Sequence, residues 1–284
     1  MQGNNPFVLL NGSTQFNDFL ARLELTLGSV FPRTMFAFRQ LINYGKEPEQ
    51  DLLHLLCNTK KTSIDIGANA GSYTHLLLKY SQNVVAFEPN PVYHKRLQKI
   101  FGRQKLRLET VALSNHSGKT ILKVPWPING LGTIEKSNTL EDIFGNKKIK
   151  YVPVKVEKLD EYKISNIGFI KIDVEGHEFA VIKGAIQSIK KSFPNLLVEI
   201  FEKHNPGSFS RVSQMLAGLG YKAYFYNVGK MLPIPSSWKR DPHYELKKMT
   251  FIYNFIFLHK KSVSTDLARF IKNPTLRFAD GVLS

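Results

Sequence analysis

The sequence predicts an α/β fold built on a mostly parallel sheet with helices on both faces. From residue 62 onward, short runs rich in β-branched and aromatic residues alternate with helical patterns. Polar residues and glycines follow several of these runs, and ligands of such a sheet bind at the carboxyl ends of its strands. The expected strands lie near residues 62–66, 83–88, 106–113, 168–173, 195–200, 221–226 and 251–258.

Helices are expected between these strands because apolar residues recur at helical spacing. The expected helices cover residues 72–80, 91–101, 178–191 and 209–220. Before the first strand, residues 14–57 are predicted to be mostly helical, with a loop at 43–48. Residues 117–160 differ from the rest, because strands near 119–125 and 150–162 indicate a small β insertion near the sheet edge.

We therefore expect three parts in the chain. Residues 1–57 form a helical extension, residues 58–261 form the main domain with its insertion at about 117–160, and residues 262–284 form a C-terminal tail. A composition of 43% hydrophobic and 22% charged residues is typical of globular proteins. No apolar run is long enough to cross a bilayer and the start does not resemble a signal peptide, so we expect a cytoplasmic protein.

The formal net charge of +16 is unusual. Such an excess favours polyanionic partners, namely nucleic acid, an anionic membrane or an acidic glycan, and the alternative is a solvated basic surface with no dedicated partner. The basic residues are dispersed along the chain. The single cysteine, Cys57, lies in a leucine-rich stretch and is interpreted as a buried apolar side chain.

The segment "SIDIGANAGSY" (63–73) contains the first candidate site. Gly67 lies where the chain must turn after a strand, and Gly71 opens the next helix. A dinucleotide fingerprint would have glycines in place of Asn69 and Ser72, so a pyrophosphate site is poorly matched. Asp65 would repel phosphate but suits a ligand that carries an ammonium or sulfonium charge, and S-adenosylmethionine is such a ligand.

The second strand ends at Glu88, where a carboxylate can accept hydrogen bonds from ribose hydroxyls. The following residues, Asn90 to Tyr93, resemble the N-P-P-Y motif of enzymes that methylate exocyclic amines. That motif belongs after the fourth strand, whereas this segment follows the second. Pro91 is therefore interpreted as the start of a helix.

The fourth strand ends in a group of titratable residues, Asp173, Glu175, His177 and Glu178. If a hydroxyl is methylated, His177 is the candidate base because imidazole titrates near neutral pH. The alternative is a solvent-facing histidine at a helix start. Asp173 and Glu175 could instead hold a divalent cation, although no metal site is predicted. Glu175 and Glu178 could also stabilise the helix N-terminus.

Further polar and aromatic residues are candidates for the acceptor pocket. Glu199, Glu202 and His204 follow the fifth strand, although Glu199 could simply pair with a lysine. Aromatic side chains in two later loops could stack on a sugar or planar acceptor, or could anchor the loops to the core. These are Trp126, Trp238 and Tyr244.

Together these motifs resemble the FkbM-type family of class I S-adenosylmethionine-dependent methyltransferases. The matching segments are 63–74, 84–91, 111–119, 169–185 and 194–200. The resemblance implies a Rossmann-like sheet of seven strands, the last antiparallel, and O-methylation of hydroxyls on sugars, glycolipids or polyketides. The first sixty residues and those after about 205 show no such resemblance, so the acceptor stays open.

The resemblance also implies residue roles. The methionine part of the cofactor would contact Asp65, Gly67, Asn69, Gly71 and Tyr73, the ribose would contact Glu88 and Asn90, and adenine would lie near Ala112. The resemblance does not identify the catalytic base. From the residues after the fourth strand, Asp173 is expected to be both a cofactor ligand and, with Glu175 and His177, a catalytic residue.

The sequence therefore predicts an S-adenosylmethionine-dependent O-methyltransferase acting on a carbohydrate, a glycolipid or a similar polyhydroxylated acceptor. Two other interpretations stay open. One is a nucleic-acid methyltransferase, which the net charge favours and the missing amine-methylation motif disfavours. The other is a non-catalytic module, for which the basic and apolar residues of 264–278 could contact an anionic membrane.

Overall fold

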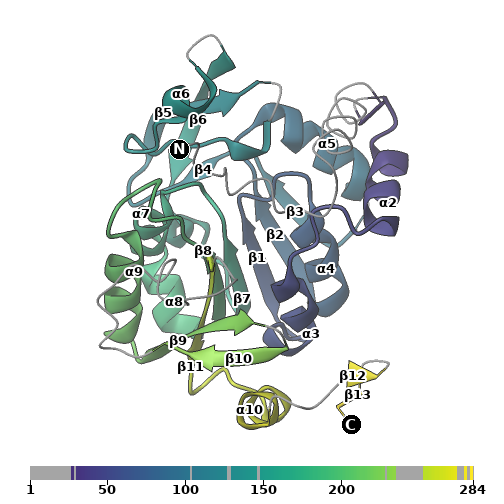
Figure 1. Ribbon diagram of the computed structural model, residues 1–284, viewed down its shortest axis with the longest axis vertical. Helices are drawn as coiled ribbons and strands as arrows, with labels where there is room; N and C mark the ends of the chain where they lie inside the picture. The colour runs from purple at the N-terminus through teal and green to yellow at the C-terminus, as the bar shows by residue number, and fades with distance from the viewer. Residues whose placement is uncertain are drawn as a thin grey trace, which may run out of the picture.

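A central sheet of eight strands organises the chain in the computed structural model (Figure 1). The structure describes residues 27–28, 30–102, 104–126, 129–145, 148–227, 229–234, 252–273, 278–279 and 282–283. The strand order is β10-β9-β11-β8-β7-β1-β2-β3. Their bounds are β1 (Thr62–Ile66), β2 (Asn83–Phe87), β3 (Leu106–Glu109), β7 (Ile167–Ile172), β8 (Asn195–Glu199), β9 (Tyr221–Asn227), β10 (Lys230–Pro233) and β11 (Asn254–His259).

The expected α/β fold is confirmed, but the sheet has eight strands and not seven. Strands β1, β2, β3, β7 and β8 run parallel, and β11 is antiparallel to both of its neighbours, β8 and β9. The additional strand is β10, which pairs antiparallel with β9 at the edge. Gly229 has a φ of 78° in the connection between them. A glycine tolerates this conformation, so the chain can fold back as a hairpin.

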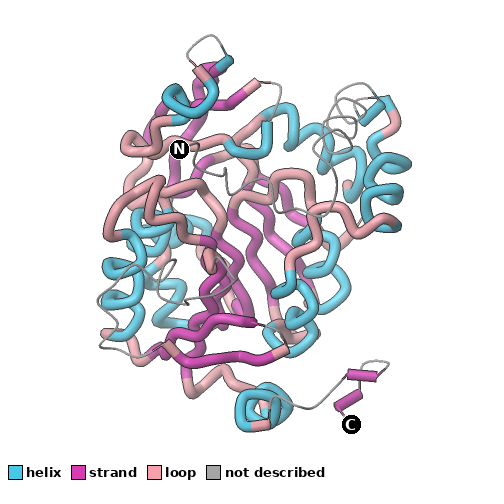
Figure 2. The backbone as a smooth tube through the Cα atoms, viewed as in Figure 1, coloured by secondary structure: helices cyan, strands magenta, loops and turns pink. Residues whose placement is uncertain are grey.

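Helices cover both faces of the sheet (Figure 2). They are α2 (Pro32–Leu41), η2 (Pro48–Leu52), α3 (Leu53–Leu56), α4 (Ser72–Tyr80), α5 (Pro91–Phe101), α7 (Glu178–Gly184), α8 (Ile186–Ser192), α9 (Ser208–Ala217) and α10 (Thr265–Lys272). Side chains alternate between the two faces of a strand, so neighbouring residues of β7 enter different cores. Ile170 packs in the core under α7, α8 and α9, whereas Phe169 packs in the core under α3, α4 and α10.

Two expected elements are divided in the structure. The helix predicted over 178–191 is interrupted at Ala185, where Gly184 packs directly on the backbone of Ser114. The strand predicted over 106–113 ends at Glu109, and Ala112–Leu113 forms a separate strand, β4, that pairs with the insertion. In both places a contact with a distant segment changes the local structure.

The insertion forms a second, small sheet, as its strand pattern predicts. Strands β5 (Gly118–Pro125) and β6 (Ile149–Glu157) pair antiparallel, and β4 (Ala112–Leu113) pairs parallel with β6. Between β5 and β6 lie η3 (Asn129–Leu131) and α6 (Leu140–Phe144), and η5 (Leu159–Tyr162) follows β6. The insertion lies at the end of the main sheet where β1 and β2 finish (Figure 1).

The two ends of the chain are described only in part. Of the residues from 14 onward that are expected to be mostly helical, 14–26 and residue 29 lie outside the described residues. In the tail, the apolar residues Leu267 and Phe270 of α10 are buried against the sheet, so this helix does not present them to a membrane. Beyond it, β12 (Phe278–Ala279) and β13 (Val282–Leu283) pair antiparallel. No helix among the described residues combines the length and apolar character required of a membrane span.

Candidate active site

The turn after β1 is fixed by a close backbone contact. Gly67 has a φ of 81°, and a Cβ atom added there would lie 1.8 Å from the carbonyl oxygen of Asp173. The amides of Gly67 and Ala68 both donate to the carbonyl of Phe87, at 3.0 and 3.2 Å. The turn therefore joins the ends of β1, β2 and β7, and only glycine fits at its first position.

Gly71 serves the packing of α4 and α5. It is the N-cap of α4 with a φ of 90°, and an added Cβ would lie 2.7 Å from side-chain atoms of both Leu97 and Phe101. It does not line the pocket described below. The close packing of α4 against α5 therefore explains why a glycine is found here, without any contact to a ligand.

The carboxylate of Glu88 is held by two backbone amides at the end of β2. Its Oε2 accepts from the amide of Asn69 at 2.7 Å, and its Oε1 accepts from the amide of Asn90 at 2.8 Å. Burial raises the pKa of Glu88 to about 7, although the two amides act in the opposite direction. The Asn90 side chain caps α5 by accepting from the amide of Val92 at 3.0 Å.

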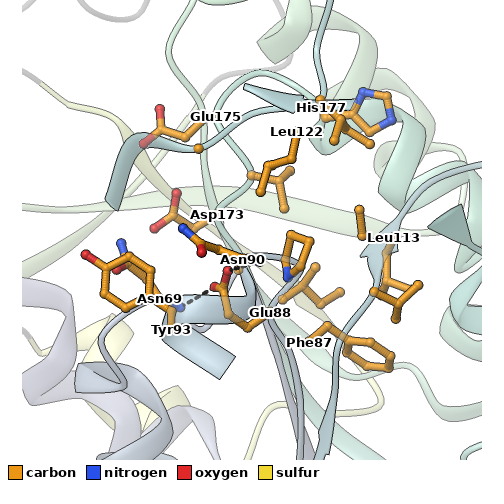
Figure 3. Close-up of a pocket in the computed structure, with 18 of the residues that line it drawn as sticks. Asn69, Phe87, Glu88, Asn90, Tyr93, Leu113, Leu122, Asp173, Glu175 and His177 are labelled. Carbon is orange, nitrogen blue, oxygen red and sulfur yellow. Dashed lines mark hydrogen bonds between the residues drawn. The ribbon is translucent and has the colours of Figure 1, made fainter. Parts of the chain in front are cut away.

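A pocket of about 610 Å³, partly open to solvent, lies at the carboxyl ends of the strands (Figure 3). One side of the pocket is apolar, and the opposite side carries carboxylates, with Glu88 between them (Figure 3). The apolar side includes Phe87, Val111, Ala112, Leu113 and Leu122, and the carboxylates are those of Asp173 and Glu175.

The structure brings many of the predicted site residues to this pocket. Its lining includes Gly67, Asn69, Glu88, Asn90, Ala112, Asp173, Glu175 and His177. It does not include Asp65, Gly71 or Tyr73. Tyr93 also lines the pocket, from the first turn of the helix that begins at Pro91.

Asp65 is buried beside α4 and does not face the pocket. It is 1% exposed, and its Oδ2 accepts a hydrogen bond from the hydroxyl of Thr74 at 2.5 Å. Burial raises the pKa of Asp65 to about 6, against the lowering effect of that hydrogen bond. Asp65 is expected from the sequence to contact the cofactor, and the structure places it outside the pocket lining, on the face of β1 opposite to Ile64 and Ile66.

A buried lysine that is not among the predicted site residues lies beside Asp173. The Nζ atom of Lys171 is 3.4 Å from Oε2 of Glu199 and 3.7 Å from Oδ2 of Asp173, and it lies 4.8 Å from the centre of the Tyr73 ring. Tyr73 in turn donates to Glu47 at 2.7 Å. The available signal was a lysine inside the apolar strand β7.

Burial alone would lower the pKa of Lys171, but Asp173 and Glu199 reverse this effect and raise it above its ordinary range. Burial raises the pKa of Glu199 as well, and Lys171 opposes that rise. The suggestion that Glu199 pairs with a lysine is therefore confirmed. Glu202 caps α9 by accepting from the amides of Gly207 and Phe209, and neither glutamate lines the pocket.

Both ring nitrogens of His177 have partners. Nδ1 lies 2.8 Å from Oε2 of Glu135, and Nε2 lies 2.8 Å from the hydroxyl of Ser114. Burial would raise the pKa of Glu135, but its hydrogen bonds with His177 and Ser137 lower it overall. His177 is thus part of a network with the insertion and is not a solvent-facing histidine. In the pocket it lies across from Glu175 (Figure 3).

Glu175 is held by the insertion from the other side. Its carbonyl oxygen accepts from the Thr133 hydroxyl at 2.8 Å and from the Asn138 side-chain amide at 2.9 Å. Its Oε2 lies 3.1 Å from Nδ1 of His204. This distance allows an ion pair, but the geometry is not that of a hydrogen bond. Neither Thr133 nor Asn138 was recognised in the sequence, because nothing in their local pattern indicates this contact.

The remaining candidates do not reach the pocket. Trp126 is exposed in the insertion and lies under Lys150, whose Nζ is 3.5 Å from the ring centre. Trp238 and Tyr244 fall outside the described residues. The described part of the chain contains no cluster of three or more His, Cys, Asp or Glu side chains arranged to hold a metal ion.

Glu178, next to this site, gives a pH-dependent prediction. Burial raises its pKa from 4.5 to about 8, and its Oε2 has no hydrogen-bond partner among the described residues. The folded chain therefore keeps a proton that the unfolded chain loses, so this contribution to stability is complete below about pH 4.5 and is lost as the pH rises through 8. We expect the unfolding free energy of Glu178→Gln, relative to that of the wild type, to be on the order of a few kcal/mol higher at pH 8.5 than at pH 5.

Urea denaturation of both proteins at the two pH values measures this effect. Other buried carboxyl groups titrate equally in both proteins and cancel in the difference. A difference in unfolding free energy that is the same at both pH values would show that Glu178 ionises normally.

Two curated relatives are similar to the chain over more than half of its length. The hexuronic acid methyltransferase AglP of Haloferax volcanii is 29% identical over 173 residues, which cover 58% of this chain and 67% of that protein. Methyltransferase 1 of Beauveria bassiana is 22% identical over 180 residues, which cover 56% of this chain and 71% of that protein.

Solved structures of methyltransferases also align with the chain. The crystal structure of a methyltransferase FkbM from Methylobacillus flagellatus aligns with a TM-score of 0.46 and 14% identity, over 70% of this chain. The alignment spans less than half, 44%, of that protein's own length. The sequence model of the methyltransferase FkbM domain matches residues 65–223, more than half of the 284 residues, and the chain therefore belongs to the FkbM methyltransferase family.

Proposed function

We propose that this protein is an S-adenosylmethionine-dependent O-methyltransferase that acts on a hydroxyl of a carbohydrate or a carbohydrate-containing lipid. The observation that carries the proposal is the carboxylate of Glu88, which two backbone amides hold at the end of β2 and which lines the pocket. A carboxylate at this place in an α/β sheet is suited to accept hydrogen bonds from ribose hydroxyls.

The two sides of the pocket fit the two ends of such a cofactor. The apolar side, with Phe87, Ala112 and Leu113, suits an adenine ring. The opposite side, with Asp173, suits the ammonium and sulfonium charges of the methionine part. When bound, S-adenosylmethionine supplies an electrophilic methyl group. The protein then has to orient the acceptor hydroxyl and take up its proton.

A carbohydrate acceptor is supported by one relative. AglP of Haloferax volcanii is named a hexuronic acid methyltransferase, and its similarity covers 58% of this chain. The pocket residues of this chain supply carboxylates that can accept hydrogen bonds from sugar hydroxyls, which is consistent with a polyhydroxylated acceptor. The proposal therefore extends to the class of acceptor and not to one sugar.

Calorimetric titration of the full chain with S-adenosylmethionine and S-adenosylhomocysteine tests cofactor binding. We expect Glu88→Gln to weaken binding of both about 10- to 100-fold, because it replaces charge-assisted hydrogen bonds and sets an amide group against a backbone N–H. Glu109→Gln is the matched control, since Glu109 ends the neighbouring strand β3 outside the pocket lining. Absence of binding by the folded wild-type protein would refute the proposal.

A further inference from the structure

The backbone of Glu175 adopts a conformation that a non-glycine residue rarely takes. Its φ is 56°, in the left-handed region. Such residues persist when their surroundings hold them, and they gather at functional sites. Thr133 and Asn138 provide this support by donating to the Glu175 carbonyl, and both are almost completely buried. The insertion therefore uses two buried polar side chains to fix one backbone carbonyl.

The fixed backbone places Glu175 in the lining of the pocket. The side chain is 10% exposed and lies on the same side of the pocket as Asp173, with its carboxylate directed away from Leu122 and His177 (Figure 3). Oε2 faces Nδ1 of His204 at 3.1 Å. Among the described residues, Oε1 accepts no hydrogen bond, and it is not one of the completely buried atoms that lack a partner. Oε1 is thus open to a donor that enters the pocket.

The charges around Glu175 suit a proton acceptor. Burial raises the pKa of Glu175, and the negative charge of Asp173 adds to this rise. His204 and Lys171 act in the opposite direction and lower it. A carboxylate with a raised pKa takes up a proton more readily near neutral pH than an ordinary glutamate does. His177 lacks the same freedom, because Glu135 and Ser114 occupy its two nitrogens and it lies on the apolar side of the pocket.

We propose that Glu175 is the catalytic base and that Thr133, Asn138 and His204 are its positioning residues. This assignment rests on the proposed function. The acceptor hydroxyl gives its proton to Oε1 of Glu175 as its oxygen forms a bond to the transferred methyl carbon. The carbon–sulfur bond breaks and its electron pair stays on sulfur, so a carboxylate, an alcohol and a sulfonium become a carboxylic acid, an ether and a thioether.

Methyl transfer from tritium-labelled S-adenosylmethionine to methyl glycosides of glucose, mannose and glucuronic acid tests the assignment. We expect Glu175→Gln to lower kcat about 10²- to 10⁴-fold, the range that a positioned base supplies, while S-adenosylhomocysteine binds within about threefold of wild type. Glu178→Gln is the matched control, because Glu178 is also buried but does not line the pocket. We expect it to keep kcat.

A double variant tests the positioning role of Thr133. Thr133→Val removes one donor to the Glu175 carbonyl and is expected to lower kcat roughly tenfold without changing S-adenosylhomocysteine affinity. In the Glu175→Gln background the same change is expected to have no further effect on kcat, because the base is already absent. An equal loss in both backgrounds would show that Thr133 only stabilises the fold.

A second measurement needs no acceptor. In protein labelled with ¹³C at the glutamate carboxyl carbon, the signal missing from Glu175→Gln belongs to Glu175. We expect it to titrate above the ordinary glutamate range, and to shift further upward in His204→Gln because His204 opposes the rise. A Glu175 signal that titrates as an ordinary exposed glutamate overturns the assignment even if no glycoside is methylated.

The outcomes separate the two proposals. Failure of wild-type protein to bind S-adenosylmethionine defeats the proposed function. Normal cofactor binding and turnover with Glu175→Gln within threefold of wild type defeats the assignment of the base alone. A large loss of kcat in His177→Gln together with a small loss in Glu175→Gln would transfer the role to His177.

Discussion

Gly67→Ala is expected to destabilise the protein by more than about 3 kcal/mol, or to prevent it from folding. Two effects combine. A left-handed backbone costs an alanine roughly 1–2 kcal/mol, and the new Cβ would lie 1.8 Å from the Asp173 carbonyl oxygen. This neighbour is backbone at the end of a buried strand and cannot move aside without breaking the contact between β1 and β7.

Gly229→Ala separates the two effects. Gly229 has a φ of 78°, close to that of Gly67, but an added Cβ would meet no atom within 4 Å. The control should therefore lose only the conformational part, roughly 1–2 kcal/mol. Urea denaturation gives the free energy of unfolding for both variants, and calorimetry gives their S-adenosylhomocysteine affinity. Equal losses in the two variants would mean that the Gly67 turn does not touch Asp173 in solution.

Local patterns predict the turn, the acid at the end of β2 and the positions of most strands along the chain. Gly67 and Glu88 each follow a strand, and the alternation of strands and helices fixes which end of the sheet they share. The side-chain direction within β1 was harder to read. Ile64 and Ile66 pack on one face, so Asp65 points to the other face and meets Thr74 instead of the pocket.

The contacts made by the insertion could not be predicted from local patterns. Glu135 and His177 are 42 residues apart, as are Thr133 and Glu175, and they meet only because β5 and β6 fold beside the end of the main sheet. The strand pattern indicated the insertion, but no periodicity indicates which of its polar residues turn inward. β10 was missed for a similar reason, since its pairing depends on a hairpin turn at Gly229.

Lys171→Met is expected to destabilise the protein by about 3–5 kcal/mol, the usual result of removing one partner from a buried ion pair. Lys171 is 1% exposed and is the cation that faces both Asp173 and Glu199. Without it, the two carboxylates lose their compensating charge, and ionisation of Glu199 becomes costly. Urea denaturation at pH 7 measures the loss, with the exposed Lys190→Met as control.

The cause of that loss can be separated from simple packing. If the unpaired carboxylate is responsible, adding Glu199→Gln to Lys171→Met should recover a large part of the stability, because the second change removes the charge that was left without a partner. If the space left by the lysine side chain is responsible, the double variant should be no more stable than the single one. Recovery would also mean that the positive charge of Lys171 stabilises the ionised acidic residues at this end of the sheet, where Asp173 lines the pocket.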